Sequence, residues 1–164
     1  MANWPHIIKS FFDKSDPENS FKRVSPKGCT KSEIATCELA IERELPQELR
    51  DFYLYSNGIG LQENESDSPR FIPVIQKLPE YIEICRRSFD ETHAEYASRY
   101  LPFIDWENGD SSGFIFNSDG TVFDYIVMFS HEQYAYDSGQ DINDFLFPFA
   151  ESLEGLLRSE DGGG

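Results

Sequence analysis

The spacing of apolar residues changes near residue 100, and this change constrains the fold more than any other feature of the sequence. Before it, apolar residues recur at the three- and four-residue intervals of amphipathic helices, and from Leu101 they form short runs typical of strands. Helices followed by strands with short turns are the pattern of an α+β domain. We therefore predict a single α+β domain over residues 1–161, a mostly antiparallel sheet flanked by helices, and a flexible Gly tail at 162–164.

The first of two consecutive predicted helices covers residues 31–44. Thr30 and Glu33 have the spacing of a capping box, in which each side chain binds the backbone N–H of the other residue. One apolar stripe follows at helical spacing: Ile34, Cys37, Ile41 and Leu45. The stripe places Cys37 on the buried face, where a thiol packs as a small hydrophobic group.

The second helix is predicted at residues 46–56, within the stretch LPQELRDFYLYSNGIGL. Pro46 suits a first helical turn, because no intrahelical bond would use its missing N–H. The apolar residues of this stretch share one face: Leu49, Phe52 and Tyr53. Asn57 and Gly58 can both adopt the left-handed conformation that ends a helix. We interpret this pair first as a turn and only second as a partner contact.

Further patterns predict the remaining elements. Residues 4–12 have helical spacing, RFIPVI is a short strand or extended segment, and LPEYIEICRRSFDETHAEYA forms one helix. SGFIFN and TVFDYIVMF form a hairpin that turns at Asp119-Gly120. DINDFLFPFAESLEGLLR reads as a closing helix that Pro148 kinks or splits. The predicted core includes Ile34, Ile41, Leu45, Leu49, Phe52, Phe114, Phe116, Phe145 and Leu146.

The charge of the chain is strongly negative and unevenly distributed. There are 30 acidic and 14 basic residues, and from Phe103 to the end thirteen acids accompany a single base, Arg158. Such a field repels nucleic acid and anionic lipid, and it speeds association with a basic protein. Solubility alone is the alternative explanation. We expect no direct nucleic-acid partner and no membrane partner.

The sequence contains none of the common catalytic or metal-binding motifs. The GxSxG and GxxxxGK[ST] patterns are absent, and the acids of DWENGD lack the final Glu of an EF-hand loop. The three histidines have no second ligand at metal-binding spacing: His6, His93 and His131. We therefore predict no catalytic residue, no metal and no cofactor. A hydrolase that uses a carboxylate pair stays a third hypothesis, because an acidic chain offers many such pairs.

Cysteine usage and hydropathy bear on the compartment. Cys29, Cys37 and Cys85 are odd in number and include no CxxC pair, so neither a disulfide framework nor a zinc site is predicted. Reduced thiols are typical of the cytoplasm. No apolar run approaches the roughly 20 residues of a membrane span, and MANWPHIIKS lacks the apolar stretch of a signal peptide. We expect a cytoplasmic protein.

Several of these pieces, taken in order, resemble the SUKH superfamily of Smi/Knr-like domains. They are TKSEIATCELAIERELPQELRDFYLYSNGIG with its Glu38, then LPFIDWENGDSSGFIFNSDG, the His131-Glu132 pair and DINDFL. The sequence departs from the pattern where Ile59 interrupts what is often Gly-Gly, and where Pro148 enters the closing element. The resemblance implies an α+β fold with a sheet flanked by helices, and a binding protein instead of an enzyme.

The resemblance also implies two functions. Many bacterial members are immunity proteins that neutralise the C-terminal domain of a polymorphic toxin, frequently a nuclease. A yeast member regulates the cell wall, so the alternative is a regulatory protein-interaction module without a toxin partner. The segments Asn108-Gly109-Asp110 and His131-Glu132 match family patterns, and we interpret both first as turn and strand-end residues.

For an immunity protein, acidic residues after Phe103 are the predicted contacts with a basic toxin domain. Unpaired acids are costly to bury, so they should form a surface patch. Exposed ion pairs contribute little individually, so aromatic residues are expected to add binding energy. The candidate partner-binding residues are Asp105, Trp106, Glu107, Asp110, Asp119, Asp124, Glu132, Tyr134, Tyr136 and Asp137.

Overall fold

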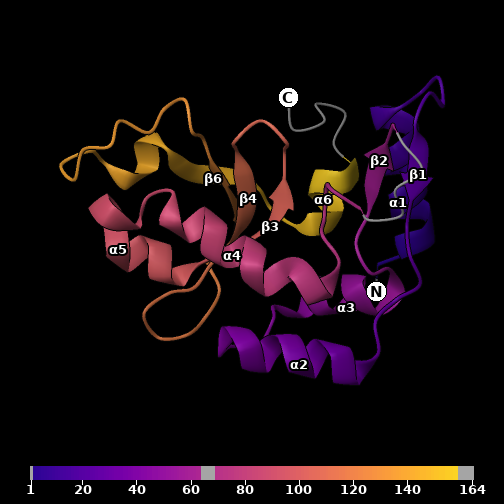
Figure 1. Cartoon of the computed structure of the whole chain (residues 1–164), viewed down its shortest axis with the longest axis horizontal. Helices are drawn as coiled ribbons and strands as arrows, with labels where there is room; N and C mark the ends of the chain where they lie inside the picture. The colour runs from indigo at the N-terminus through magenta and orange to yellow at the C-terminus, as the bar shows by residue number, and fades with distance from the viewer. Residues whose placement is uncertain (1, 64–68, 159–164) are drawn as a thin grey trace.

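A four-stranded antiparallel sheet occupies the C-terminal half of the chain in the computed structural model, which describes residues 2–63 and 69–158 (Figure 1). Its strands are neighbours in chain order: β3 (Tyr100–Asp105), β4 (Ser111–Ile115), β5 (Ile126–Phe129) and β6 (Leu146–Ala150). A separate antiparallel pair joins β1 (Lys22–Val24) to β2 (Gly60–Gln62). The predicted hairpin between β4 and β5 is confirmed, and its turn is closed by a hydrogen bond from Asn117 N to Thr121 O.

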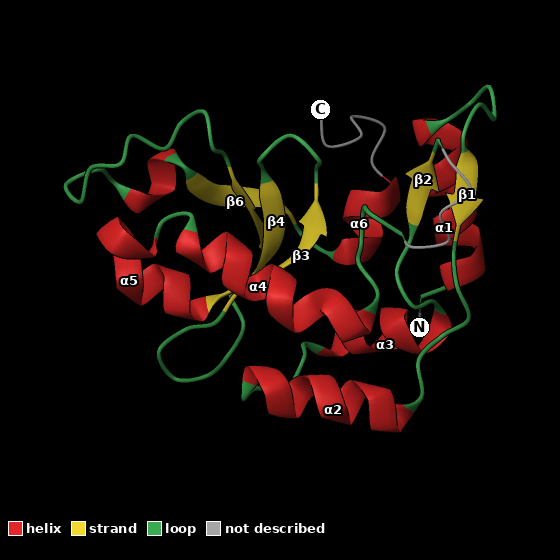
Figure 2. Ribbon diagram, in the orientation of Figure 1, coloured by secondary structure: helices red, strands yellow, loops and turns green. Residues whose placement is uncertain are grey.

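The α-helices lie below this sheet and to its right in Figure 2. They are α1 (Trp4–Ser15), α2 (Lys31–Ile41), α3 (Gln47–Tyr55), α4 (Leu78–Arg87), α5 (Asp90–Arg99) and α6 (Leu153–Arg158), with short 3-10 helices η1 (Ile75–Lys77) and η2 (Ile142–Asp144). Hydrogen bonds from Tyr81 Oη to Ile104 O and from Arg86 Nε to Tyr100 O attach α4 to β3. The predicted α+β class is therefore confirmed. The Gly tail at 162–164 and part of the polar segment before Pro69 lie outside the described residues.

The predicted capping box opens α2. Thr30 N donates to Glu33 Oε1 over 2.9 Å, and Glu33 N donates to Thr30 Oγ1 over 3.1 Å. The helix ends at Ile41, before the predicted residue 44, because Glu42 takes a left-handed φ of 57°. The Glu38 carboxylate then accepts hydrogen bonds from Leu45 N and from the Arg50 guanidinium, so it fixes the corner between α2 and α3.

The end of α3 corrects part of the turn prediction. Ser56, the residue that follows the helix, is extended, and only Gly58 has a positive φ, at 94°. Asn57 uses its side chain instead of a left-handed backbone. Its Oδ1 accepts from Ile75 N over 2.7 Å, and its Nδ2 donates to Gln76 Oε1 over 3.0 Å. Pro46 precedes the first helical residue instead of occupying the first turn.

Two predicted helices are wrong in part. The helix predicted from residue 78 is divided into α4 and α5, because Phe89 is non-helical and turns its ring against Phe129 and Phe145 in the core. The predicted closing helix contains η2, strand β6 and only then α6. Pro148 lies exposed on β6, and an edge strand tolerates its missing N–H.

The predicted core is confirmed except at one position, Ile41, which is half-buried. The buried members are Ile34, Leu45, Leu49, Phe52, Phe114, Phe116, Phe145 and Leu146. The larger cluster joins α1, α2 and α3 to the sheet. A smaller cluster around Phe89, Tyr100 and Phe145 lies beneath the long segment between β5 and β6. It thereby fixes one end of the loop that carries several candidate residues.

Candidate functional site

Two acidic loops leave the main sheet at the same end. Asp105 pairs with Ser111, Ser111 with Phe129 and Phe129 with Leu146, so the ends of β3 and β5 lie beside the starts of β4 and β6. We call residues 105–110 and 130–141, which join these strands, the acidic edge. Figure 1 shows both loops at the top of the molecule. The acidic edge contains six carboxylates and neither Lys nor Arg: Asp105, Glu107, Asp110, Glu132, Asp137 and Asp141.

The first loop is a tight turn held by its own side chains. Asp105 Oδ1 accepts from Glu107 N over 2.8 Å, and Asn108 Oδ1 accepts from Asp110 N over 2.9 Å. Glu107 and Gly109 both have positive φ. The turn therefore directs the exposed Glu107 carboxylate outward from a fixed backbone.

An aspartate–histidine contact joins the two loops. Asp110 Oδ1 accepts from His131 N over 3.0 Å and lies 2.5 Å from His131 Nδ1. Since a carboxylate only accepts, Nδ1 carries the proton in this contact. The two segments that match family patterns, Asn108-Gly109-Asp110 and His131-Glu132, thus meet in space and hold the base of the acidic edge together.

The second loop is attached to α5 by hydrogen bonds. Gln140 donates from Nε2 to Gln133 O and accepts at Oε1 from Ala135 N, which closes the loop on itself. His93 Nε2 lies 2.8 Å from Gln140 O, a carbonyl that can only accept, so Nε2 is the protonated nitrogen. His93 has non-helical φ and ψ within α5, where it turns its ring toward this loop. The loop is therefore ordered without contact from a partner.

The three candidate aromatic residues have different environments. Tyr134 is only 7% exposed, and its hydroxyl bonds Thr92 Oγ1 over 2.6 Å, so it packs in the smaller core cluster and presents little surface to a partner. Trp106 is half-buried, and its Nε1 donates to Ser112 Oγ. Tyr136 is 79% exposed and lies 4.5 Å, ring to ring, from Tyr134. Tyr136 is the aromatic residue that the acidic edge offers to a partner.

Two candidate acids are not brought to this surface. Asp119 and Asp124 belong to the segment between β4 and β5, which lies at the opposite end of the sheet from the acidic edge (Figure 1). The Asp119 carboxylate accepts from the hydroxyl and backbone N–H of Thr121, and these bonds lower the pKa of Asp119. The seven acids proposed as one patch therefore fall into two groups. Asp105, Glu107, Asp110, Glu132 and Asp137 remain together on the two loops of the acidic edge.

The cysteines and the grouping of potential metal ligands bear on catalysis and metal binding. Across residues 2–63 and 69–158, no three His, Cys, Asp or Glu side chains come together as a set able to hold a metal ion. The three cysteines are buried free thiols, and burial raises the pKa of Cys29 to about 12 and those of Cys37 and Cys85 to about 11. Such thiols remain protonated at neutral pH, when only a thiolate is a strong nucleophile. In the same part of the chain, no helix has the length and apolar character needed to cross a membrane.

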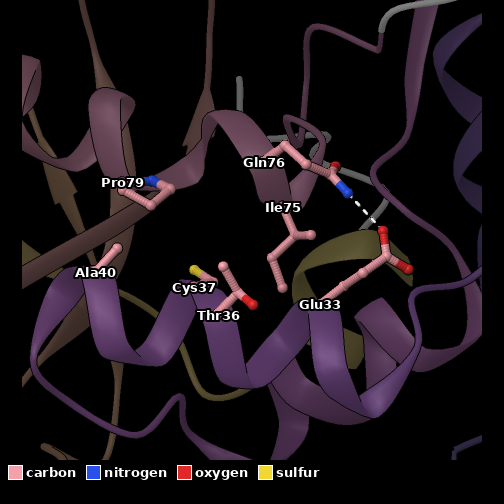
Figure 3. A pocket seen from close by; sticks show the side chains of 7 residues that line it. All are labelled: Glu33, Thr36, Cys37, Ala40, Ile75, Gln76 and Pro79. Carbon is pink, nitrogen blue, oxygen red and sulfur yellow. Dashed lines mark hydrogen bonds between the residues drawn. The ribbon is translucent and has the colours of Figure 1, made fainter.

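A pocket between α2 and the η1–α4 segment was not predicted from the sequence (Figure 3). Its volume is about 270 Å³, and its lining comes from Glu33, Thr36, Cys37, Ala40, Ile75, Gln76 and Pro79. In the sequence, Glu33 had a predicted role in the capping box, and no local pattern gave Gln76 a role. The two side chains meet across 43 positions of sequence, where Gln76 Nε2 donates to Glu33 Oε2. Only the fold brings the walls of this pocket together.

A comparison with protein families identifies the family of this chain. The model of the SMI1 / KNR4 family (SUKH-1) matches residues 28–158, which is most of the chain. The chain therefore belongs to this family, as its sequence resemblance predicts. A search of curated proteins found no match. Membership of this family is consistent with a protein-interaction module.

Proposed function

We propose that this member of the SMI1 / KNR4 family (SUKH-1) is an immunity protein that binds and neutralises a basic toxin domain through the acidic edge. The observation that carries the proposal is the charge of two adjacent loops, which hold six carboxylates and no Lys or Arg. The family, consistent with an interaction module, supports action by binding. That the partner is a toxin is part of this proposal.

The physical basis is charge complementarity. A nuclease, for example, holds phosphates with Lys and Arg, so an acidic surface can cover the groove that would bind nucleic acid. Charge of this kind accelerates the encounter and selects the orientation of docking. The hydrogen bonds of Asp105, Asn108 and Gln140 already order both loops, which reduces the entropy lost on binding.

Aromatic contact is expected to supply binding energy that exposed charges do not. Ion pairs at the rim of an interface contribute little individually. Tyr136 is largely exposed, and its ring lies tilted against the ring of the buried Tyr134, so it already has a supported position. Tyrosine is among the residues that most often dominate binding energy. Tyr136 is therefore the proposed aromatic contact, and Glu107 and Glu132 are the proposed charged contacts.

The test uses the C-terminal domain encoded by the gene next to this one, coexpressed with the protein. Association is measured by surface plasmon resonance at low and high salt, and toxicity by growth. Glu107→Lys combined with Glu132→Lys should slow association about tenfold at low salt and flatten its salt dependence. Neither side chain has a hydrogen-bond or ion-pair partner in the described part of the chain, so the fold should tolerate both changes.

A matched control separates local charge from total charge. Glu18→Lys combined with Glu151→Lys changes the formal net charge equally, since two reversals of two units each take −16 to −12. Both residues are exposed and lie outside the acidic edge. Equal slowing by both double variants would mean that only net charge matters, and no slowing by the first would place docking elsewhere. If no toxin gene adjoins this one and the encoded neighbour does not bind, the regulatory alternative is favoured.

A further inference from the structure

The pocket between α2 and η1–α4 combines an apolar lining with one fixed carboxylate. Cys37, Ile75 and Pro79 supply its apolar surface, and Ala40 lies at one end (Figure 3). At the other end, Glu33 and Gln76 meet through a 2.6 Å hydrogen bond. Glu33 is the only charged residue in this lining.

The Glu33 carboxylate takes part in the helix cap, and a second contact outside the cap also holds it in position. Oε1 accepts from Thr30 N, whereas Oε2 accepts from Gln76. Asn57 Nδ2 donates to Gln76 Oε1, which orients the Gln76 amide so that its Nε2 faces Glu33. Residues from α2, η1 and the end of α3 thus hold one carboxylate beside an apolar pocket.

The bonds to Glu33 also keep it charged. The backbone N–H and hydroxyl of Thr30 lower the pKa of Glu33, so the carboxylate is ionised at neutral pH. A carboxylate accepts about four hydrogen bonds, and the contacts with Thr30 and Gln76 leave capacity for a donor from outside. Anions are disfavoured here, because the whole chain carries a formal charge of −16.

We propose that this pocket binds a lysine or arginine side chain of a partner protein, with its aliphatic stem against Cys37, Ile75 and Pro79 and its cationic end at Glu33. The volume of about 270 Å³ lies below the range usual for drug-sized ligands, and it suits a single long side chain. Such side chains carry an apolar stem with a charged end. In Figure 1, α2 lies at the bottom of the molecule, far from the acidic edge, so this is a second binding site.

Titration of the ¹⁵N-labelled full chain by NMR tests the pocket. The probes are Nα-acetyl-lysine methylamide and the same compound acetylated at Nε, which keeps the stem but lacks the charge. The cationic probe should shift the amides of Cys37, Ile75 and Gln76 with a Kd in the millimolar range, as is usual for so small a ligand. Loss of the charge should weaken binding at least fivefold. Equal binding of both probes, or shifts elsewhere only, would overturn the proposal.

Variants of the protein separate the pocket from the fold. Glu33→Gln should weaken the cationic probe at least fivefold while the helix cap survives, because Gln also serves in a capping box. Glu80→Gln, an exposed change on α4 outside the pocket lining, should have no effect. Ala40→Leu should obstruct the pocket, whereas Ala35→Leu, also exposed on α2, should not. Unchanged binding in Glu33→Gln or Ala40→Leu would refute the site.

A third probe, n-butylammonium, presents the same charge without a peptide backbone. Tighter binding of the capped lysine supports a protein side chain as the occupant. Tighter binding of n-butylammonium would refute a protein side chain as the occupant and would assign the pocket to a free amine. Neither result depends on the acidic edge, so this proposal and the proposed function can fail separately.

Discussion

Replacing Asn57 by Ala should destabilise the protein through one buried backbone group. The Asn57 Oδ1 accepts from Ile75 N over 2.7 Å, and Ile75 is 1% exposed. Leaving a buried donor unsatisfied costs about 1–3 kcal/mol. The second bond, from Nδ2 to Gln76, joins exposed side chains and contributes about 0.5 kcal/mol. The free energy of unfolding should therefore fall by roughly 1.5–3.5 kcal/mol.

Asn57→Asp is the matched control, because it keeps an acceptor for Ile75 N and replaces the donor to Gln76 with a charged acceptor. It should cost about 1 kcal/mol or less. Urea denaturation followed by circular dichroism measures both changes, and hydrogen exchange should show lost protection of the Ile75 amide in the alanine variant alone. For a chain of this size, each 1 kcal/mol corresponds to about 2–4 °C in Tm. Equal loss in both variants, or a loss under about 0.5 kcal/mol for Ala, would refute the assigned role of the acceptor.

Three further predictions concern other parts of the fold. Gly58→Ala should cost at least about 2 kcal/mol, because its Cβ would lie 2.4 Å from Ile72 O at a φ of 94°; Gly120→Ala, with similar φ and open space, should cost about 1 kcal/mol in the same denaturation assay. Glu48→Ala should lower the free energy of unfolding by about 1–2 kcal/mol, because the Glu48 carboxylate accepts from Leu153 N and Glu154 N and so caps α6. Glu48→Gln should retain part of the capping energy, and equal stability of the parent protein and both variants would contradict the cap. Burial raises the pKa values of the three thiols, so their contribution to the free energy of unfolding should be constant with pH below about 8.5 and fall as pH approaches 11, because the unfolded thiols ionise first. An alkaline denaturation series on a triple Cys→Ala variant should show a smaller fall than the parent protein, and the remainder belongs to the buried hydroxyls of Tyr53, Tyr81 and Tyr100, whose pKa values burial also raises; an equal fall in both proteins would contradict the thiol contribution.

Local sequence patterns predict an element correctly where the contacts that stabilise it are local. The capping box of α2 joins Thr30 to Glu33, and the β4–β5 turn joins Asn117 to Thr121, so both could be predicted from short segments. The segment from Ile142 was predicted as helix because its apolar spacing fits one. It forms β6 since β5 offers a partner for Leu146 and its neighbours, and that pairing is not visible in local spacing. Pro148 was the one local sign against a continuous helix.

For the candidate site too, local features could be predicted and contacts between distant residues could not. The sequence located the acids but not their grouping, because the contact between Asp110 and His131 joins positions 21 residues apart. The separation of Asp119 from Asp105 could have been predicted from the order of the strands. Successive turns of an antiparallel meander lie at alternate ends of the sheet, so the β3–β4 and β4–β5 turns cannot share one edge. Burial of Tyr134 had no such local sign, since it depends on Thr92 and Phe145 from distant segments.

Under the proposed function, stability and partner recognition use different side chains in this protein. Glu38 and Asn57, which carry part of the family resemblance, are occupied by backbone hydrogen bonds to Leu45 and Ile75. Glu107 and Glu132 make no side-chain hydrogen bond or ion pair to any described residue, although backbone bonds hold the loops around them. Their reversal should therefore change the free energy of unfolding by no more than about 0.5 kcal/mol. Because the same substitutions should slow association about tenfold, a loss of binding in these variants can be attributed to the surface and not to unfolding.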